Sequence, residues 1–332
     1  MSKDTYEPAA DRYSNSVGYE YCGKSGLKLP RISLGLWHNF GDVDDAAEAQ
    51  KMIQFAFDHG ITHFDLANNY GTPYGSAEKN FGKILKDQLS TYRDELIIST
   101  KAGHEMWPGP YGDWGSRKYL IASLNQSLQR LKLDYVDIFY SHRYDPNTPL
   151  EETMGALSDA VKQGKALYVG ISKYPTDKAR EAYRILRENG TPCLINQDKY
   201  NIFTRHIEEN VLPLAQENGV GVIAFSPLSQ GMLSDKYLQG IPENSRAAHS
   251  YGFFQKQQLT PEVIEKIKRL NDIAASRGQS LAQMALAWCL HKPQITSVIV
   301  GTSSVKQLQD NIDSLRNTAF TDDELWRIGE LG

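Results

Sequence analysis

Residues 46–66 read AAEAQKMIQFAFDHGITHFDL, and the order of features in this stretch decides which fold the chain adopts. Apolar side chains such as Met52 and Phe55 recur at the spacing of one helical face. Gly60 then suits the left-handed position that ends many helices. The following residues, 61–66, are mostly apolar, as is typical of a short strand buried on both faces. The stretch therefore predicts a helix, a glycine stop and a buried strand.

The same order recurs along the chain. Helical patterns that end at a glycine, followed by an apolar run, lie at 153–163 with 166–171, at 179–189 with 193–196, and at 207–218 with 222–225. Further apolar runs lie at 32–37, 95–100, 135–140 and 296–300. Eight such strand and helix units without a break in composition predict an α/β protein with a closed (β/α)8 TIM barrel. A doubly wound sheet is the alternative, but no GxGxxG loop occurs.

Segments outside the repeat complete the predicted architecture. Residues 19–30 predict a β-hairpin ahead of the first barrel strand. The stretches 103–117 and 229–260 exceed usual loop lengths, and because both follow strands we expect them at the C-terminal face, where barrel active sites are built. We interpret residues 1–332 as a single domain, with residues 1–16 as a loosely ordered N-terminal tail.

Composition excludes several classes of protein. Of the 332 residues, 40% are hydrophobic and 23% are charged, which allows a substantial core. A net charge of −4 without a basic block argues against nucleic acid or an anionic membrane as a partner. Cys22, Cys193 and Cys289 are widely spaced and form no CxxC pair, so we expect a reducing compartment. The N-terminus lacks an apolar signal stretch, and we expect a cytoplasmic protein.

Polar residues stand where the predicted strands end. The four with the most distinctive chemistry are Asp65, Tyr70 five residues later, Lys101 and His142. In a barrel all of them surround one mouth. A Lys held by a carboxylate stays charged, and its charge favours phenolate, so we expect the pKa of Tyr70 to be lowered toward neutrality for proton exchange with a carbonyl oxygen. His142 can hydrogen-bond the same oxygen.

Two other chemistries are disfavoured. The eight histidines show no HxH or HExxH spacing, so no metal site is predicted. A Ser-His-Asp hydrolase is disfavoured because no GxSxG elbow occurs.

The chain resembles the aldo-keto reductase family over nearly its whole length. The motifs are GITHFDLANNYG at 60–71, STK at 99–101, DYVDIFYSHR at 134–143 and VGIS at 169–172. DPNTPLEET at 145–153 and SDKY at 234–237 resemble most the branch that holds the potassium channel β subunits and the bacterial L-glyceraldehyde 3-phosphate reductases, with the reductases more similar. The resemblance matches Asp65, Tyr70, Lys101 and His142 to the family's catalytic positions.

The resemblance also implies a cofactor, NADPH, bound extended across the mouth. Its implied contacts, from the nicotinamide to the adenosine end, are Trp37, Asp65, Ser172, Gln197, Phe225, Ser226, Leu228, Gln230, Gly231, Lys236, Arg246, Gly301, Ser303, Gln307 and Asn311. The wider family's Lys and Arg near the last helix are here Gly301 and Gln307. Recognition of the 2′-phosphate is therefore assigned to Lys236 and Arg246.

The implied reaction is reduction of small aldehydes to alcohols, with glyceraldehyde 3-phosphate or methylglyoxal-like substrates and a role in methylglyoxal detoxification. Aromatic residues that could wall the carbonyl pocket are Trp37, Trp107, Tyr111 and Trp114. Arg143 and Lys173 are candidates for an anionic group of the substrate, or for the cofactor or a pair with Glu151. By resemblance a homo-oligomer, a tetramer or octamer, is expected.

Two alternatives stand beside the reductase. One is a redox-sensing NADPH-binding subunit with slow turnover, related to the potassium channel β subunits. The other is a barrel isomerase that uses the lysine for a Schiff base. His142 favours the reductase, because the channel subunits carry Asn at that position. Asp65 would keep Lys101 charged, which disfavours a Schiff base.

Overall fold

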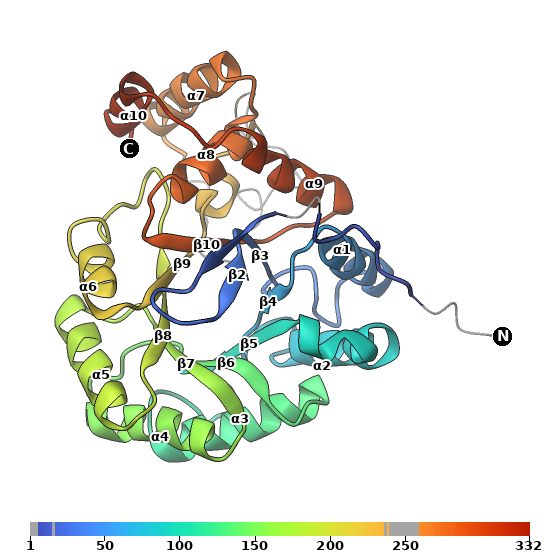
Figure 1. Ribbon diagram of the computed structural model, residues 1–332, viewed down its shortest axis with the longest axis vertical. Coiled ribbons are helices and arrows are strands. Elements are labelled where there is room, and N and C mark those ends of the chain that lie inside the picture. The colour runs from blue at the N-terminus through green and yellow to red at the C-terminus, as the bar shows by residue number, and fades with distance from the viewer. Residues whose placement is uncertain (1–5, 15–16, 236–237, 239–258) are drawn as a thin grey trace.

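Eight parallel strands form a closed barrel in the computed structural model, which describes residues 6–14, 17–235, 238 and 259–332 (Figure 1). Around the barrel the strands follow the order β10, β3, β4, β5, β6, β7, β8 and β9. Their bounds are β3 (Ile32–Gly35), β4 (His63–Asp65), β5 (Ile97–Ala102), β6 (Val136–Ser141), β7 (Ala166–Ser172), β8 (Cys193–Lys199), β9 (Gly221–Phe225) and β10 (Ile295–Val300). The (β/α)8 barrel predicted from the repeat is confirmed.

Helices surround the barrel. They are α1 (Ala46–Asp58), α2 (Ser76–Ile84), α3 (Arg117–Leu131), α4 (Leu150–Lys162), α5 (Thr176–Glu188), α6 (Val211–Asn218), α8 (Leu281–Leu290) and α9 (Val305–Asp313), with the short segments η1 (Leu85–Leu89) and η2 (Ser90–Glu95) after α2. The glycines predicted to end four of them, Gly60, Gly164, Gly190 and Gly219, all have a φ between 70° and 78°. These left-handed residues turn the chain into the next strand.

A β-hairpin closes the N-terminal end of the barrel, as predicted. β1 (Tyr19–Tyr21) pairs antiparallel with β2 (Lys28–Pro30), and the turn region contacts the start of β9. A Cβ atom on Gly23 would lie 2.2 Å from the carbonyl oxygen of Gly219, so only glycine fits this approach. With one end closed, the C-terminal end is left as the mouth.

Side chains alternate between the inside and the outside of the barrel wall. On β6, Ile138 and Tyr140 point into a small inner cluster that Cys22 and Leu29 of the hairpin region complete. Phe139, between them, belongs to the larger core beneath the helices. Residues two apart on one strand therefore both point into the barrel interior, below the C-terminal mouth.

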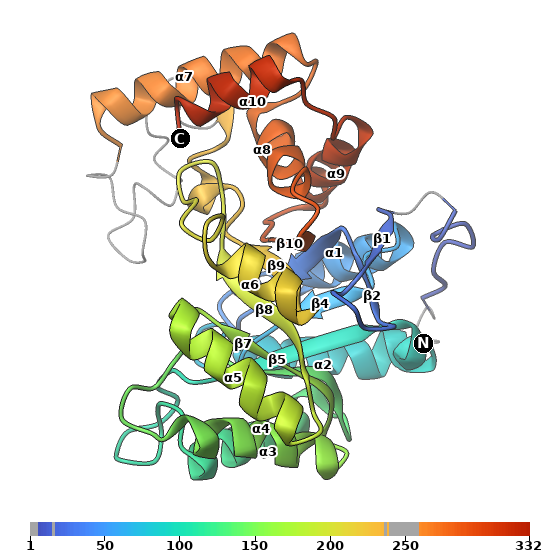
Figure 2. The ribbon, with the colours of Figure 1, turned by 60° about the vertical axis from the view of Figure 1, so that its left-hand side comes forward.

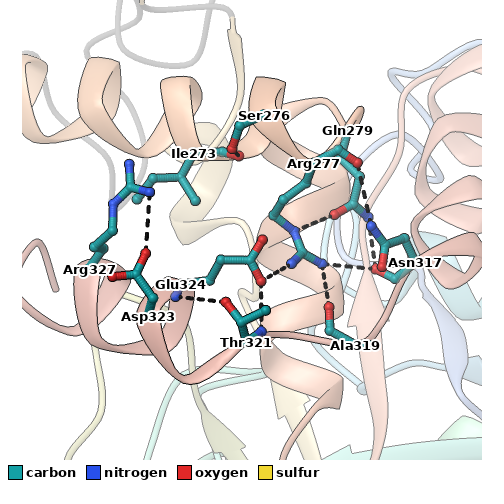
Figure 3. Close-up of polar contacts among 10 residues, drawn as sticks. All are labelled: Ile273, Ser276, Arg277, Gln279, Asn317, Ala319, Thr321, Asp323, Glu324 and Arg327. Atoms are coloured by element: carbon teal, nitrogen blue, oxygen red, sulfur yellow. Dashed lines mark hydrogen bonds and ion pairs between the residues drawn. The ribbon is translucent and has the colours of Figure 1, made fainter.

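The C-terminal part adds a layer outside the barrel. Figure 2 shows α7 (Pro261–Ser276) and α10 (Asp322–Gly329) side by side, beyond α8 and α9. Two further short helical segments are η3 (Ser229–Gly231), which follows β9, and η7 (Ser314–Arg316), which follows α9. In Figure 3 the guanidinium of Arg277, at the end of α7, reaches Glu324 of α10 at 2.7 Å and the carbonyl oxygen of Ala319 at 2.8 Å. The Arg277 side chain therefore links α10 to the end of α7.

Residues 6–14, part of the segment expected to be a loosely ordered tail, lie against α1 and η2. The hydroxyl of Tyr6 and the backbone N–H of Ala9 donate to the same carboxylate oxygen of Asp58, at 2.7 and 2.8 Å. Arg12 pairs with Glu95 at 2.7 Å. No helix in the described part of the chain is long and apolar enough to cross a membrane.

Candidate active site

The four residues singled out from the sequence meet at the C-terminal mouth of the barrel. Asp65 is the last residue of β4, Lys101 lies near the end of β5 and His142 follows β6 directly. Tyr70 lies in the loop before α2, where its carbonyl oxygen accepts hydrogen bonds from the N–H groups of Gly75 and Ala77 at 3.2 Å. Three of the four residues are therefore positioned by the ends of barrel strands, and Tyr70 is positioned by the hydrogen bonds of its loop.

Lys101 is the centre of this set. Its side chain is 0% exposed, and its Nζ lies 2.6 Å from Oδ2 of Asp65, 2.6 Å from the carbonyl oxygen of Leu66 and 3.4 Å from the phenol oxygen of Tyr70. An ammonium has three hydrogens, so all three have an acceptor. Because Tyr70 accepts from Lys101, its own hydroxyl hydrogen remains for another acceptor.

The electrostatics of Tyr70 correct one prediction. Burial raises the pKa of Tyr70 above its ordinary value; the Lys101 ammonium lowers it and the Asp65 carboxylate raises it, and the net direction is upward. The expected lowering toward neutrality was wrong, because it counted the cation and not the loss of water. Burial opposes the charge on Lys101, but the contacts with Asp65 and Tyr70 together outweigh burial, and the pKa of Lys101 is raised. At neutral pH the pair is therefore a charged ammonium and a protonated phenol.

His142 supplies a neutral imidazole at the same place. It is 7% exposed, and its ring stands edge-on to Tyr70 with the centroids 6.0 Å apart. Burial, and then the charge of Lys101, lower the pKa of His142 well below its ordinary value. Its Nδ1 is buried without a hydrogen-bond partner. A neutral imidazole with a free nitrogen can orient a carbonyl oxygen beside the phenol.

The loop after β5 carries three of the four aromatic residues predicted for the substrate pocket. Trp107 packs on Tyr119 of α3, with ring centroids 5.3 Å apart, whereas Tyr111 and Trp114 are exposed. The fourth, Trp37 after β3, has its ring 6.2 Å from that of Tyr70. Of the four aromatic residues, Trp37 is thus the one with a ring contact to Tyr70.

The two candidate anion ligands differ in how free they are. Arg143 stacks 3.6 Å over the ring of Trp114, donates to the carbonyl oxygen of Gly103 at 2.6 Å and pairs with Asp113 at 2.7 Å. It is committed to the loop after β5, and not to Glu151. Lys173, by contrast, has its Nζ 3.1 Å from Nε2 of His104. No ion pair joins Lys173 to a carboxylate in the described ranges.

Residues implied for the nicotinamide end fit a carboxamide group. Ser172 and Gln197 are paired in register on β7 and β8. The Ser172 hydroxyl is buried without a partner, and Nε2 of Gln197 donates to Oδ1 of Asp65 at 3.1 Å. An unpartnered buried hydroxyl marks a place for a polar ligand group. Phe225, at the end of β9, is half-buried and offers a ring face.

Residues implied for the rest of the cofactor lie on two loops. After β9, Ser226 and Gln230 have φ values of 53° and 59°, and such left-handed backbone in non-glycine residues often marks a ligand site. Near α9, Gln307 accepts hydrogen bonds from the backbone and the hydroxyl of Ser303 at 3.0 Å. The other implied residues in these two regions are Leu228, Gly231, Gly301 and the buried Asn311. Lys236 and Arg246 lie outside the described residues.

Sequence reasoning missed two residues here. The hydroxyl of Ser99 donates to Oδ1 of Asp65 at 2.8 Å. It precedes Lys101 by two residues, and the alternation of a strand places both in the interior, which was a usable signal. His104 stacks edge-on against His142, with centroids 4.6 Å apart, and burial lowers its pKa to about 4. Nothing in its sequence context indicated this contact.

The fold and site define a class of protein: a (β/α)8 barrel with a buried Asp, Lys and His and a neighbouring Tyr gathered at its C-terminal mouth. Residues 31–332 match the profile of the aldo/keto reductase family. The chain belongs to this family and is an oxidoreductase that acts on small carbonyl compounds. In the described residues no cluster of three or more metal-ligating side chains could hold a metal ion.

Similar proteins include two that are named as reductases and one that is named as a channel subunit. L-glyceraldehyde 3-phosphate reductase of Escherichia coli O157:H7 is 54% identical over 326 residues, which cover 96% of this chain and 93% of the relative. The protein of the same name from strain K12 is 53% identical over the same shares. A probable voltage-gated potassium channel subunit beta of Arabidopsis thaliana is 38% identical over 90% of each chain. The predicted branch, with the reductases more similar, is confirmed.

Proposed function

We propose that the protein reduces small aldehydes to alcohols with NADPH, with Tyr70 as the general acid. The observation that carries the proposal is the contact of Lys101 with both Asp65 and the phenol oxygen of Tyr70, at 2.6 and 3.4 Å. NADPH, when bound, supplies a hydride to the carbonyl carbon. Tyr70 then gives its free hydroxyl hydrogen to the carbonyl oxygen, while the Lys101 ammonium stabilises the phenolate left behind.

The other groups of the mouth orient the reactants. A neutral His142 donates a hydrogen bond to the same carbonyl oxygen and so aims it at Tyr70. Ser172 and Gln197 hold the carboxamide of the nicotinamide, and Phe225 packs on its ring. Gln197 also contacts Asp65, so cofactor and acid share one hydrogen-bonded frame.

Preference for NADPH over NADH is assigned to Lys236 and Arg246, through the 2′-phosphate. A guanidinium on a phosphate is a charge-assisted contact. Titrating both cofactors by tryptophan fluorescence tests this: NADPH should bind more tightly than NADH in the native protein, and Arg246→Ala should remove the difference. Equal affinities in the native protein would contradict the assignment.

We propose a phosphorylated aldehyde of the glyceraldehyde 3-phosphate type as substrate. Lys173 presents an ammonium without a carboxylate partner in the described residues. Its Nζ contacts His104, whose ring packs against that of His142, so the ammonium lies close to the proposed catalytic residues. The named reductases at 53–54% identity act on such a compound. Arg143 is committed elsewhere, so Lys173 is the group that meets the phosphate.

Following NADPH oxidation with glyceraldehyde 3-phosphate, methylglyoxal and an aromatic aldehyde tests the function. We expect turnover with all three and the highest kcat/KM with the phosphorylated compound. Tight binding of NADPH without turnover of any aldehyde would contradict the reductase. That result would favour the second candidate function, a redox-sensing NADPH-binding subunit, which is supported by the similarity to the channel subunit.

A further inference from the structure

A chain of buried hydrogen bonds crosses four adjacent strands inside the barrel and ends on Asp65. Ser297 of β10 lies 2.7 Å from Ser33 of β3, whose hydroxyl lies 2.9 Å from Nδ1 of His63 in β4. Nε2 of His63 lies 3.0 Å from the hydroxyl of Ser99 in β5, which donates to Oδ1 of Asp65 at 2.8 Å. The three serines and His63 are 0% exposed. No role in the reaction has been given to any of these four.

The direction of each hydrogen in this chain follows from its end. The Asp65 carboxylate, paired with Lys101, can only accept, so Ser99 gives it its single hydrogen. Ser99 must then accept from His63, which places a hydrogen on Nε2. Burial lowers the pKa of His63 to about 4, so the ring is neutral and Nδ1 accepts from Ser33. Each donor therefore points along the chain toward Asp65.

This chain constrains how Asp65 meets Lys101. Oδ1 of Asp65 receives hydrogen bonds from Ser99 and Gln197, which leaves Oδ2 facing the ammonium at 2.6 Å. If the Ser99 hydroxyl were free to turn, it could donate elsewhere and the carboxylate could rotate. His63 removes that freedom, because its Nε2–H occupies the lone pair of Ser99.

We propose that His63 is a positioning residue for the reduction: through Ser99 it fixes the carboxylate of Asp65, and thereby holds Lys101 against Tyr70. The inference rests on the proposed function. A histidine that merely filled the core would need its two nitrogens satisfied but would have no effect on the chemical step. The two roles make different predictions.

Four substitutions separate them. His63→Leu removes both hydrogen bonds, and His63→Gln keeps a donor amide at the position of Nε2. Ser99→Ala removes the link to Asp65. The matched control is Thr100→Val, on the opposite face of the same strand, which removes a hydroxyl bond of 2.5 Å to the buried carboxylate of Glu78. Ser99 and Thr100 thus lose the same kind of bond on adjacent residues.

We expect Ser99→Ala to lower kcat by about 10- to 100-fold, as loss of a hydrogen bond to a charged group implies. His63→Leu removes hydrogen bonds to two hydroxyl groups, and we expect it to lower kcat by about 3- to 10-fold. The deuterium isotope effect on kcat with NADPH deuterated at the transferred position should rise, because the chemical step slows. The dissociation constant of NADPH should change less than about 3-fold. His63→Gln should recover most of the rate, and Thr100→Val should keep it.

A second measurement does not depend on turnover. Nitrogen NMR of ¹⁵N-histidine protein, with His63 assigned from the His63→Gln spectrum, should show a protonated Nε2 and an unprotonated Nδ1 at neutral pH. The opposite tautomer, a charged ring, or equal losses of kcat in Ser99→Ala and Thr100→Val would overturn the inference. If the native protein reduces no aldehyde, the proposed function fails, and with it the positioning role, whereas the NMR result still decides the direction of the chain.

Discussion

Tyr70 experiences two opposing influences within a few ångströms. Loss of water raises its pKa, and the ammonium of Lys101, 3.4 Å from its oxygen, acts in the other direction. The result is a phenol that is protonated at neutral pH, with a cation beside its oxygen that would stabilise a phenolate if the proposed proton transfer to a carbonyl oxygen took place. That combination is what a general acid for hydride transfer requires.

Tyr70→Phe removes only the hydroxyl group. We expect kcat to fall by about 10² to 10⁴-fold, because general acid catalysis contributes that much, while the dissociation constant of NADPH stays nearly the same. Tyr74→Phe is the control, since Tyr74 lies in the same loop and is 61% exposed. Native turnover in Tyr70→Phe would disprove the assignment.

Lys173 is the residue at which substrate choice can be tested. Lys173→Gln should lower kcat/KM for glyceraldehyde 3-phosphate by about 10- to 100-fold, as for a charge-assisted bond, and leave methylglyoxal nearly unaffected. The control is Lys162→Gln, which removes an exposed charge at the end of α4, before β7 begins. Equal losses for both aldehydes would show that Lys173 does not recognise the phosphate.

The pH dependence of the same contact has a defined sign. The walls of the mouth bury the ammonium of Lys173 enough to lower its pKa to about 8, although much of the residue as a whole is exposed. Lys173 is charged below that pH and neutral above it. KM for the phosphorylated aldehyde should therefore rise as the pH passes about 8, and KM for methylglyoxal should not follow it.

Among the helices, α10 is linked to α7 by the side chain of one arginine. Arg277, 3% exposed at its side chain, donates to Glu324, Gln279 and two backbone carbonyl groups and stacks 3.7 Å from the ring of Phe320. Glu324 in turn closes the capping box that begins α10. The end of α7 and the beginning of α10 are thus joined through a single guanidinium (Figure 3).

Arg277→Met should lower the free energy of unfolding by about 1–3 kcal/mol, because it removes a charged side chain that is 3% exposed, together with its hydrogen bonds to Glu324, Gln279 and two carbonyl groups. Arg327→Met on α10 is the control: its 3.6 Å pair with Asp323 is exposed, and its loss should cost less than about 0.5 kcal/mol. Unfolding followed by circular dichroism measures both. Equal shifts for the two variants would show that the buried contacts carry no special weight.

In the whole molecule, the reactivity of the three buried cysteines can be used to measure unfolding of the barrel. Cys22 lies beside the hairpin, Cys193 on β8 and Cys289 on α8, and all three are free and buried. Burial raises the pKa of each thiol, so none of the three thiols is accessible or ionised in the native protein at neutral pH.

We expect no reaction of the native protein with a thiol reagent at neutral pH and reaction of all three thiols in denaturant. Near the unfolding midpoint the three should react at one common rate, because closing the barrel couples the hairpin, β8 and α8 in one structure. Mass spectrometry of each labelled peptide measures the rates. Early labelling of one cysteine alone would show that its region opens independently.

The barrel, and the gathering of the four candidate residues at its mouth, could be predicted from local sequence patterns. Eight apolar runs, with Gly60, Gly164 and their counterparts after the helices, encode local structure, because helix spacing and left-handed glycines act within a few residues. Strand ends then place Asp65, Lys101 and His142 at one mouth, since parallel strands of a barrel share a direction.

The pKa values and the contacts of these residues follow from the three-dimensional packing of the barrel. Whether the Tyr70 pKa rises or falls depends on how much water is excluded by segments distant in the chain. That Arg143 is bound to Asp113 while Lys173 is not, and that His63 reaches Asp65 through Ser99, depends on side chains from different strands and loops meeting. Burial and distances between distant residues are properties of the packed barrel, and local sequence patterns do not contain them.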